Sequence, residues 1–135
     1  MDKKTIQLVQ NSWAKVVPIA PQAAEIFYGK LFALDPKLKK LFKNDMKTQG
    51  NKLMQMLGAA VGMLNNLDGL VPVLQDLAKR HVDYGVVEKD YATVGAALLA
   101  TLSDGLGKEF TPEVKEAWTS VYGVMTGVMI KAAKA

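Results

Sequence analysis

Cysteine is absent from this chain, and histidine occurs only once, at position 81. Without cysteine, the protein cannot form disulfides, thiolate sites for zinc or iron–sulfur clusters, or a cysteine nucleophile. A lone histidine also excludes metal sites that need paired histidines, and no serine or carboxylate stands at a recognisable spacing from His81 for a nucleophilic triad. We therefore do not expect a catalytic site built only from side chains.

Long hydrophobic runs are also missing. The most apolar stretches, residues 57–64, 94–102 and 121–130, fall well short of the roughly 20 residues that a membrane-spanning helix needs. The first residues are polar and lack the apolar run and small-residue cleavage site of a signal peptide. We expect a cytoplasmic protein without a membrane partner.

The net charge of +4 is distributed unevenly. Residues 1–52 contain ten lysines against four acidic residues, whereas the remainder contains seven basic and nine acidic residues. Much of the excess falls in one short stretch, at Lys37, Lys39, Lys40, Lys43 and Lys47. Such a cluster is either a solvated face or a docking patch for an acidic partner. Nucleic acid is a less expected partner, because aromatic residues do not interleave with the lysines as a surface for stacking on bases would require.

Apolar residues recur every three or four positions almost throughout the chain, and the alternation typical of strands is scarce. The sequence therefore predicts an all-α protein, in one domain that spans residues 1–135. About seven helices are expected, at residues 3–17, about 21–34, 36–42, 49–64, 70–82, 89–106 and 111–135, with a loop at 43–48. Their unequal lengths and the prolines near several helix starts favour an irregular orthogonal arrangement over an up-and-down bundle.

The first two predicted helices have clear candidate core faces. The stripe expected to be buried in the first helix consists of Ile6, Val9, Trp13 and Val16. Asp2 is the candidate N-cap of this helix. The residues expected to be buried in the second helix are Ala23, Ile26, Phe27, Phe32 and Leu34, with Tyr28 and Leu31 on a neighbouring stripe.

A lone histidine has several roles open to it. His81 could be a buried structural residue, a surface residue, a general base or a metal ligand, and neutral imidazole often does no more than complete a hydrogen bond. If His81 acts chemically, the role that requires the fewest other side chains is that of a single axial ligand to a cofactor with its own remaining donors. Haem is the leading case.

Several residues before and after His81 occur in a characteristic order. They are Phe27-Tyr28, Leu41-Phe42, Gln49, Leu53, Lys79-Arg80-His81, Trp118 and Tyr122, together with the stretches 66–70 and 81–91. In order and spacing, these residues resemble those of bacterial single-domain haem globins and of the globin domain of flavohaemoglobins, over nearly the whole chain. The resemblance implies a globin fold around a haem pocket. Since cysteine is absent, it also implies haem b (iron protoporphyrin IX) bound without a covalent link.

The resemblance assigns residues to both faces of the haem. His81 is implied to be the proximal iron ligand, with Phe42 against the porphyrin. Tyr28, Gln49 and Leu53 are implied to lie over the distal face, where a phenol hydroxyl and an amide can stabilise a partly anionic gas ligand. Gln49 and Leu53 are four residues apart, so they share one helix face. Judged from the residues alone, ordinary core packing is the alternative for Tyr28 and Leu53.

On the proximal side, the resemblance places Tyr91 near His81. Flavohaemoglobins complete this arrangement with a glutamate in the last helix, whereas here Ala133 stands at the matching position. The acid that would strengthen electron donation by the histidine is therefore absent. Arg80 and Lys52 are candidates to neutralise the haem propionates, with a solvated charge as the alternative for each.

The function that the resemblance implies is reversible binding of dioxygen, nitric oxide and carbon monoxide, for oxygen storage, delivery or transport. The second function is that of a nitric oxide dioxygenase for nitric oxide detoxification. It would depend on a separate reductase, because the chain is expected to end near the end of the globin domain. A haem-free helical interaction module is a remote third alternative. We expect a monomer or a weak homodimer.

Overall fold

The computed structural model describes residues 2–42 and 45–134, and within these ranges the chain is helical without a strand. The predicted all-α class is therefore confirmed. The α-helices are α1 (Lys3–Val16), α2 (Ala20–Leu34), α3 (Met46–Gly62), α4 (Leu67–Tyr84), α5 (Glu88–Leu106) and α6 (Pro112–Ala133). The short 3₁₀-helices are η1 (Val17–Ile19), η2 (Pro36–Leu41) and η3 (Gly107–Glu109). In the described part of the chain, the six α-helices and η2 correspond to the seven helices expected.

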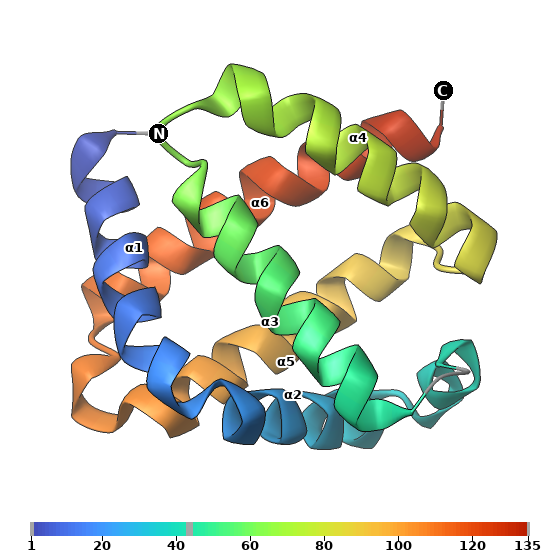
Figure 1. The fold of residues 1–135 in the computed structure, drawn as a ribbon, viewed down its shortest axis with the longest axis horizontal. Coiled ribbons are helices and arrows are strands. Elements are labelled where there is room, and N and C mark those ends of the chain that lie inside the picture. Colours follow the sequence, from blue (N-terminus) through green and yellow to red (C-terminus); the bar gives the residue numbers. More distant parts are fainter. Residues whose placement is uncertain (1, 43–44, 135) are drawn as a thin grey trace.

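The helices cross one another instead of running side by side as in a bundle (Figure 1). α3 passes diagonally across the view with α5 and α6 behind it, while α1 and α4 lie along two edges. The main packing contacts join α2 to α5 and α3, and join α6 to α4 and α1. This is the irregular orthogonal arrangement that the sequence predicts. Among the described helices, none is both long enough and apolar enough to cross a membrane.

The predicted starts of two helices are wrong by three residues. α3 begins at Met46 instead of residue 49, because the Asp45 carboxylate accepts a hydrogen bond from the Thr48 N–H at 3.3 Å. α4 begins at Leu67 instead of residue 70, because the Asn66 side-chain oxygen accepts from the Gly69 N–H at 3.2 Å. Capping by a side chain satisfies N–H groups that have no partner within the helix. The predicted loop at 43–48 therefore ends before Met46, and its residues 43 and 44 lie outside the described residues.

The core stripe predicted for α1 is confirmed. Its four residues are all buried, namely Ile6, Val9, Trp13 and Val16. The predicted cap is confirmed too, since the Asp2 carboxylate accepts from the Thr5 N–H at 2.8 Å. Trp118 of α6 packs against Trp13 and donates its Nε1–H to the Ser12 hydroxyl at 2.8 Å, so the buried indole has an acceptor.

The core face predicted for α2 is partly wrong. Leu34 is 56% exposed, and Ile26 and Phe32 are only half-buried, whereas Tyr28 and Leu31 are fully part of the core. The physical reason is that α2 packs against both α5 and α3, so that its buried face is wider than one stripe and is rotated toward Tyr28. This rotation turns the tyrosine into the protein interior.

Candidate functional site

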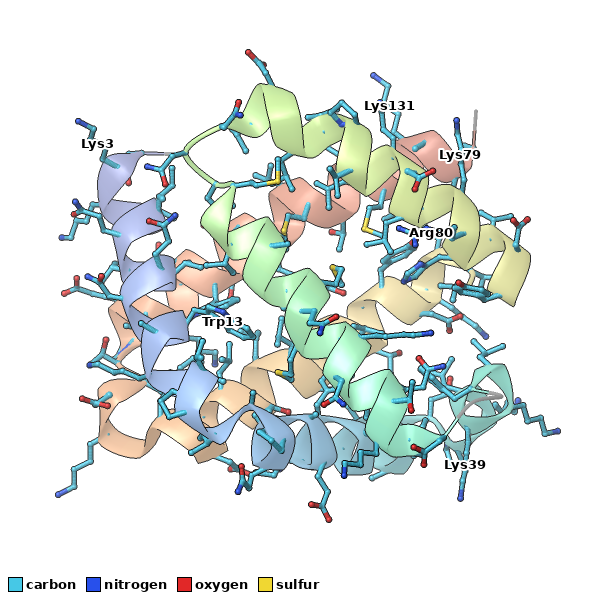
Figure 2. All side chains as sticks on the ribbon, viewed as in Figure 1. Lys3, Trp13, Lys39, Lys79, Arg80 and Lys131 are labelled. Atoms are coloured by element: carbon cyan, nitrogen blue, oxygen red, sulfur yellow. The ribbon has the colours of Figure 1, made fainter. Side chains whose placement is uncertain are left out.

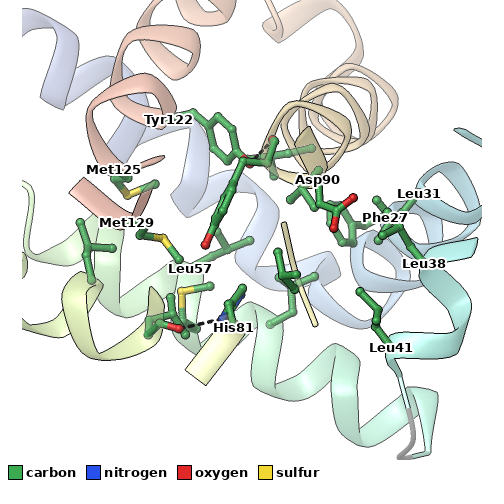
Figure 3. Close-up of a pocket in the computed structure, with 18 of the residues that line it drawn as sticks. Phe27, Leu31, Leu38, Leu41, Leu57, His81, Asp90, Tyr122, Met125 and Met129 are labelled. Atoms are coloured by element: carbon green, nitrogen blue, oxygen red, sulfur yellow. Dashed lines mark hydrogen bonds between the residues drawn. The ribbon is translucent and has the colours of Figure 1, made fainter. Parts of the chain in front are cut away.

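A nonpolar pocket lies among α2, η2, α3, α4, α5 and α6, and Figure 3 shows most of the side chains that line it. Its apolar lining consists of Phe27, Leu31, Leu38, Leu41, Phe42, Leu53, Met56, Leu57, Leu74, Leu77, Val86, Val94, Leu98, Met125 and Met129. Among the described residues, the polar side chains that line it come from α4, α5 and α6, at His81, Asp90, Tyr91 and Tyr122. The pocket therefore has one polar wall, which contains the chain's single histidine.

His81 lies in the last turn of α4, where the backbone reverses at Gly85. Gly85 has a φ of 94°, in the left-handed region that glycine adopts without strain, and the N–H of Val86 donates to the His81 carbonyl at 3.0 Å. This helix end holds the His81 backbone at the edge of the pocket. The side chain is directed into the pocket with its Nδ1 2.9 Å from the Leu77 carbonyl oxygen.

The hydrogen bond of His81 defines which nitrogen is free. A carbonyl oxygen only accepts hydrogen bonds, so Nδ1 is the protonated nitrogen, and Nε2 keeps its lone pair. Burial lowers the pKa of His81, and the charge of Arg80 acts in the same direction, although the bond to Leu77 opposes this shift. His81 is therefore a neutral imidazole at neutral pH, which is the form that binds metal ions.

Tyr91 lies beside His81, as predicted. The two rings are nearly parallel, at 13°, with their centroids 6.4 Å apart. The Tyr122 hydroxyl donates to the backbone carbonyl of Tyr91 at 2.6 Å and so joins α6 to α5 at this point. The two helices come this close because Gly95 has no side chain, since a Cβ there would lie 2.6 Å from the Tyr122 ring. Burial raises the pKa of both tyrosines, so both stay neutral.

The predicted distal residues are only partly at the pocket. Leu53 lines it, whereas Tyr28 and Gln49 are not among the lining residues. Phe42, which was predicted to lie against the porphyrin, also lines the pocket. The Tyr28 hydroxyl donates to the backbone carbonyl of Gln49 at 3.3 Å, and its ring packs edge-on against Phe42 with centroids 5.2 Å apart. Burial raises the pKa of Tyr28 to about 12, so the hydroxyl keeps its proton.

A close crossing of α2 and α3 brings Tyr28 to Gln49. A Cβ on Gly50 would lie 3.0 Å from the Cβ of Ala24, so glycine allows the two backbones to approach here. Tyr28 is one helical turn after Ala24, and Gln49 precedes Gly50. The resemblance predicted that Tyr28 and Gln49 lie together, and the crossing at Gly50 is how the fold achieves it.

The candidate propionate partners lie on the surface. Arg80 is exposed and its Nε is 3.5 Å from the Asp76 carboxylate, one turn earlier in α4. Lys52 is exposed on α3, and neither residue lines the pocket. Ala133 is the last residue of α6, and the acidic residues of that helix, Glu113 and Glu116, lie in its first two turns.

Two residues of the polar wall had no role in the sequence-based prediction of the site. Tyr122 was noted only as one of the residues in the characteristic order, and its hydrogen bond to Tyr91 links positions 31 residues apart. Asp90 is buried, and its carboxylate accepts from the Val87 N–H at 3.0 Å. An acidic residue in the first turn of a helix is a recognisable capping signal, so Asp90 could have been found as a cap. Nothing in the sequence indicated that Tyr122 or Asp90 lines the pocket.

The fold and the pocket define a helical protein with an apolar pocket into which a neutral histidine is directed. The globin family model matches residues 25–129, and the chain belongs to the globin family. It is 30% identical over 137 residues to the flavohemoprotein of Bacillus subtilis (strain 168), an alignment that covers 96% of this chain and 33% of that relative. The flavohemoprotein of Rhodopirellula baltica is 29% identical over 133 residues, with the same coverage of each chain.

This chain spans about a third of the length of these two curated relatives. The predicted resemblance to bacterial globins and to the globin part of flavohaemoglobins is confirmed. As a globin, the chain is a haem protein that binds diatomic gases.

Proposed function

We propose that the chain binds haem b without a covalent link, with His81 as the protein ligand of the iron, and that it binds dioxygen, carbon monoxide and nitric oxide reversibly, for oxygen storage or delivery. The observation that carries this proposal is the hydrogen bond between the His81 Nδ1 and the Leu77 carbonyl at the edge of an apolar pocket. It leaves a neutral imidazole with a free Nε2, the donor that haem iron takes from histidine.

The pocket residues fit this cofactor. When bound, haem supplies a ferrous iron that takes up a diatomic gas. The aliphatic and aromatic lining, which includes Phe42 and Leu53, would exclude water from the porphyrin and hold it by apolar contact. His81 would keep its orientation through Leu77, and the parallel ring of Tyr91 would limit its rotation.

We propose that Tyr28 and Gln49 stabilise the bound gas from the distal side. The bond from the Tyr28 hydroxyl to the Gln49 carbonyl is 3.3 Å long, whereas O–H···O bonds are commonly about 2.7–2.8 Å. A bond of this length is a weak one that the hydroxyl can exchange for a stronger acceptor. A gas ligand that gains negative charge on binding is such an acceptor.

Nitric oxide dioxygenase activity with a separate reductase is the second candidate function. Its support is the similarity to two flavohemoproteins, together with the tyrosine that lies parallel to His81. Against it, α6 has no carboxylate after Glu116, and Ala133 stands where the acid would be expected. Steady-state consumption of nitric oxide by stopped flow, with a reductase present, separates the two functions. Turnover far above that of a simple oxygen-binding globin would favour the enzyme.

Absorption spectroscopy of the purified protein tests the proposal directly. The protein should show the intense violet band of haem, which shifts when carbon monoxide is added to the reduced form. The His81→Ala variant should purify with little haem, and added imidazole should restore the spectrum by filling the vacated ligand position. Val82→Ala is the matched control, because Val82 neighbours His81 in α4 but is exposed and does not line the pocket. Haem content and spectrum that are unchanged in His81→Ala would refute the assignment, and wild-type protein without haem would favour a haem-free interaction module.

A further inference from the structure

The chain's net positive charge comes from one segment. Residues 35–52 contain six lysines and two aspartates, a net charge of +4, which equals the net charge of the whole chain. The other 117 residues contain eleven basic and eleven acidic residues and are neutral overall. A protein that only needed charge for solubility would not have to concentrate it in this way.

The described lysines of this segment project into solvent. We call them the lysine collar: Lys37, Lys39 and Lys40 on η2, and Lys47 and Lys52 on α3, all of them exposed. None of the five forms a salt bridge with a described residue. The carboxylates of Asp35 and Asp45 accept hydrogen bonds from helix N-termini, at the Lys37 and Thr48 N–H groups. The collar is therefore a cationic surface without acidic side chains paired to it in the described structure.

The collar lies on the outer side of the segments that line the pocket. On η2, Leu38 is buried and lines the pocket between the exposed Lys37 and Lys39, and Leu41 lines it next to Lys40. On α3, Leu53 lines the pocket directly after Lys52. Lys39 extends away from the molecule at the corner opposite Lys3 in Figure 2. A partner bound to the collar would be separated from the pocket by little more than the thickness of η2.

We propose that the lysine collar is the docking surface for an acidic electron-donor protein. This inference rests on the proposed function, because the electron is delivered to haem: ferric iron gains one electron and becomes ferrous, while the donor loses one electron and no covalent bond changes. Charge complementarity selects an acidic surface, and long-range attraction raises the rate of encounter. Because the collar lies on the outer side of segments that line the pocket, a partner bound there would be close to the haem that the pocket is proposed to hold.

Protein is a better match for this surface than nucleic acid. Phe32 and Phe42, the aromatic residues before and after η2 in the chain, pack on each other with centroids 5.6 Å apart and against the hydrophobic core, instead of forming an exposed surface for bases. The exposed side chains of Leu34 and Met46 at the ends of α2 and α3 give the same stretch of chain apolar contact points. A charged rim with a few apolar contacts is typical of transient protein interfaces.

The test measures binding of an acidic plant-type ferredoxin to the haem-loaded protein at low and high salt. The triple variant Lys37→Glu, Lys39→Glu, Lys40→Glu should bind at least about tenfold more weakly at low salt, because the attraction becomes repulsion. The control triple variant Lys3→Glu, Lys108→Glu, Lys115→Glu has the same net charge but changes exposed lysines elsewhere, and should bind within about threefold of wild type once long-range charge is screened. Arginine at the three collar positions should restore wild-type binding.

A second readout follows reduction of the ferric protein by stopped flow. The rate with reduced ferredoxin should fall in parallel with affinity, whereas the rate with dithionite should be similar in all variants. Equal weakening by both triple variants, no binding by wild type, or equally tight binding of wild type to anionic vesicles or duplex DNA would overturn the proposal. If wild type lacks haem, the proposed function fails, while ferredoxin binding to the apoprotein still tests the collar.

Discussion

Gly95 and Tyr122 should be energetically coupled, because the Tyr122 ring occupies the space that a side chain on residue 95 would need. A Cβ at position 95 would lie 2.6 Å from one ring atom of Tyr122 and 3.1 Å from another, closer than atoms in packed proteins approach. The ring cannot move away freely, because its hydroxyl is bound to the Tyr91 carbonyl at 2.6 Å. The substitution Gly95→Ala must therefore separate α5 from α6 or break that hydrogen bond.

The expected magnitude follows from two opposing effects. Overpacking a buried contact costs about 1–3 kcal/mol, whereas alanine in place of glycine within a helix gains roughly 0.5–1 kcal/mol. The difference between the two effects is a net destabilisation of roughly 0–2.5 kcal/mol, with about 1 kcal/mol as the central expectation for Gly95→Ala. In a Tyr122→Leu background the clash is removed, and the same change should become stabilising. The interaction energy between the two sites should then be about 1–3 kcal/mol.

The assay is urea unfolding of the four proteins of this double-mutant cycle, followed by far-ultraviolet circular dichroism. Gly123→Ala is the matched control, since Gly123 also lies within a helix but has nothing within 4 Å of the added methyl group. It should stabilise the protein by roughly 0.5–1 kcal/mol. The reasoning is refuted if Gly95→Ala is as favourable as this control, or if it costs the same with and without the Tyr122 ring.

Two further predictions concern the distal site and the start of a helix. Tyr28→Phe should speed dioxygen dissociation by about tenfold if the hydroxyl contributes roughly 1.4 kcal/mol to the bound gas. Stopped-flow ligand replacement measures this rate, Tyr84→Phe at an exposed site is the control, and an unchanged rate in Tyr28→Phe excludes the donor role. Asn66→Ala should lower the free energy of unfolding by about 1 kcal/mol, and Asn66→Ser by much less because serine also caps helices. Equal losses in the two Asn66 variants in urea unfolding would mean that the side-chain cap does not stabilise α4.

The helices were predictable because their signals are local. Apolar spacing is visible within one helix, and so is the predicted cap at Asp2, which the structure confirms. The spacing of apolar residues predicts the starts of α3 and α4 too late, because the capping residues Asp45 and Asn66 precede the first buried residue of each helix by several positions. Those two caps were readable from the sequence.

The face of α2 was less predictable, because it depends on how many partners the helix has. Spacing predicts one stripe, but α2 lies against α5 and α3 together and buries Tyr28 and Leu31 as well. Leu34, which sits at the end of the helix, remains exposed although it is apolar. Tertiary packing of this kind is not encoded in any short window of residues.

The candidate site, like the helices, was predictable only in part, because some of its features depend on residues far apart in the sequence. Nothing near His81 in sequence distinguishes a ligand from a structural histidine, and only the characteristic order of residues across the chain suggested its role. The hydrogen bond to Leu77, one turn earlier, is the local feature that leaves Nε2 free, and its presence depends on the rotamer. The contribution of Tyr122 depends on a contact with another helix, so neither spacing nor composition could indicate it.

For Tyr28 and Gln49, the sequence and the atomic positions give different information. The sequence implies which residues lie together, and the structure shows which of their atoms are in contact. The order of residues implied that Tyr28 and Gln49 lie together, and the structure shows that they do, through the Gly50 crossing. The acceptor of the hydroxyl, however, is a backbone carbonyl, which any residue at position 49 would supply. The glutamine side chain is therefore not needed to hold Tyr28 in place, and among the described residues no hydrogen-bond partner occupies its amide. A residue that lies next to a pocket, and whose identity packing does not require, is a candidate for ligand recognition. Gln49 fits this description, which supports its proposed role with Tyr28 in gas binding.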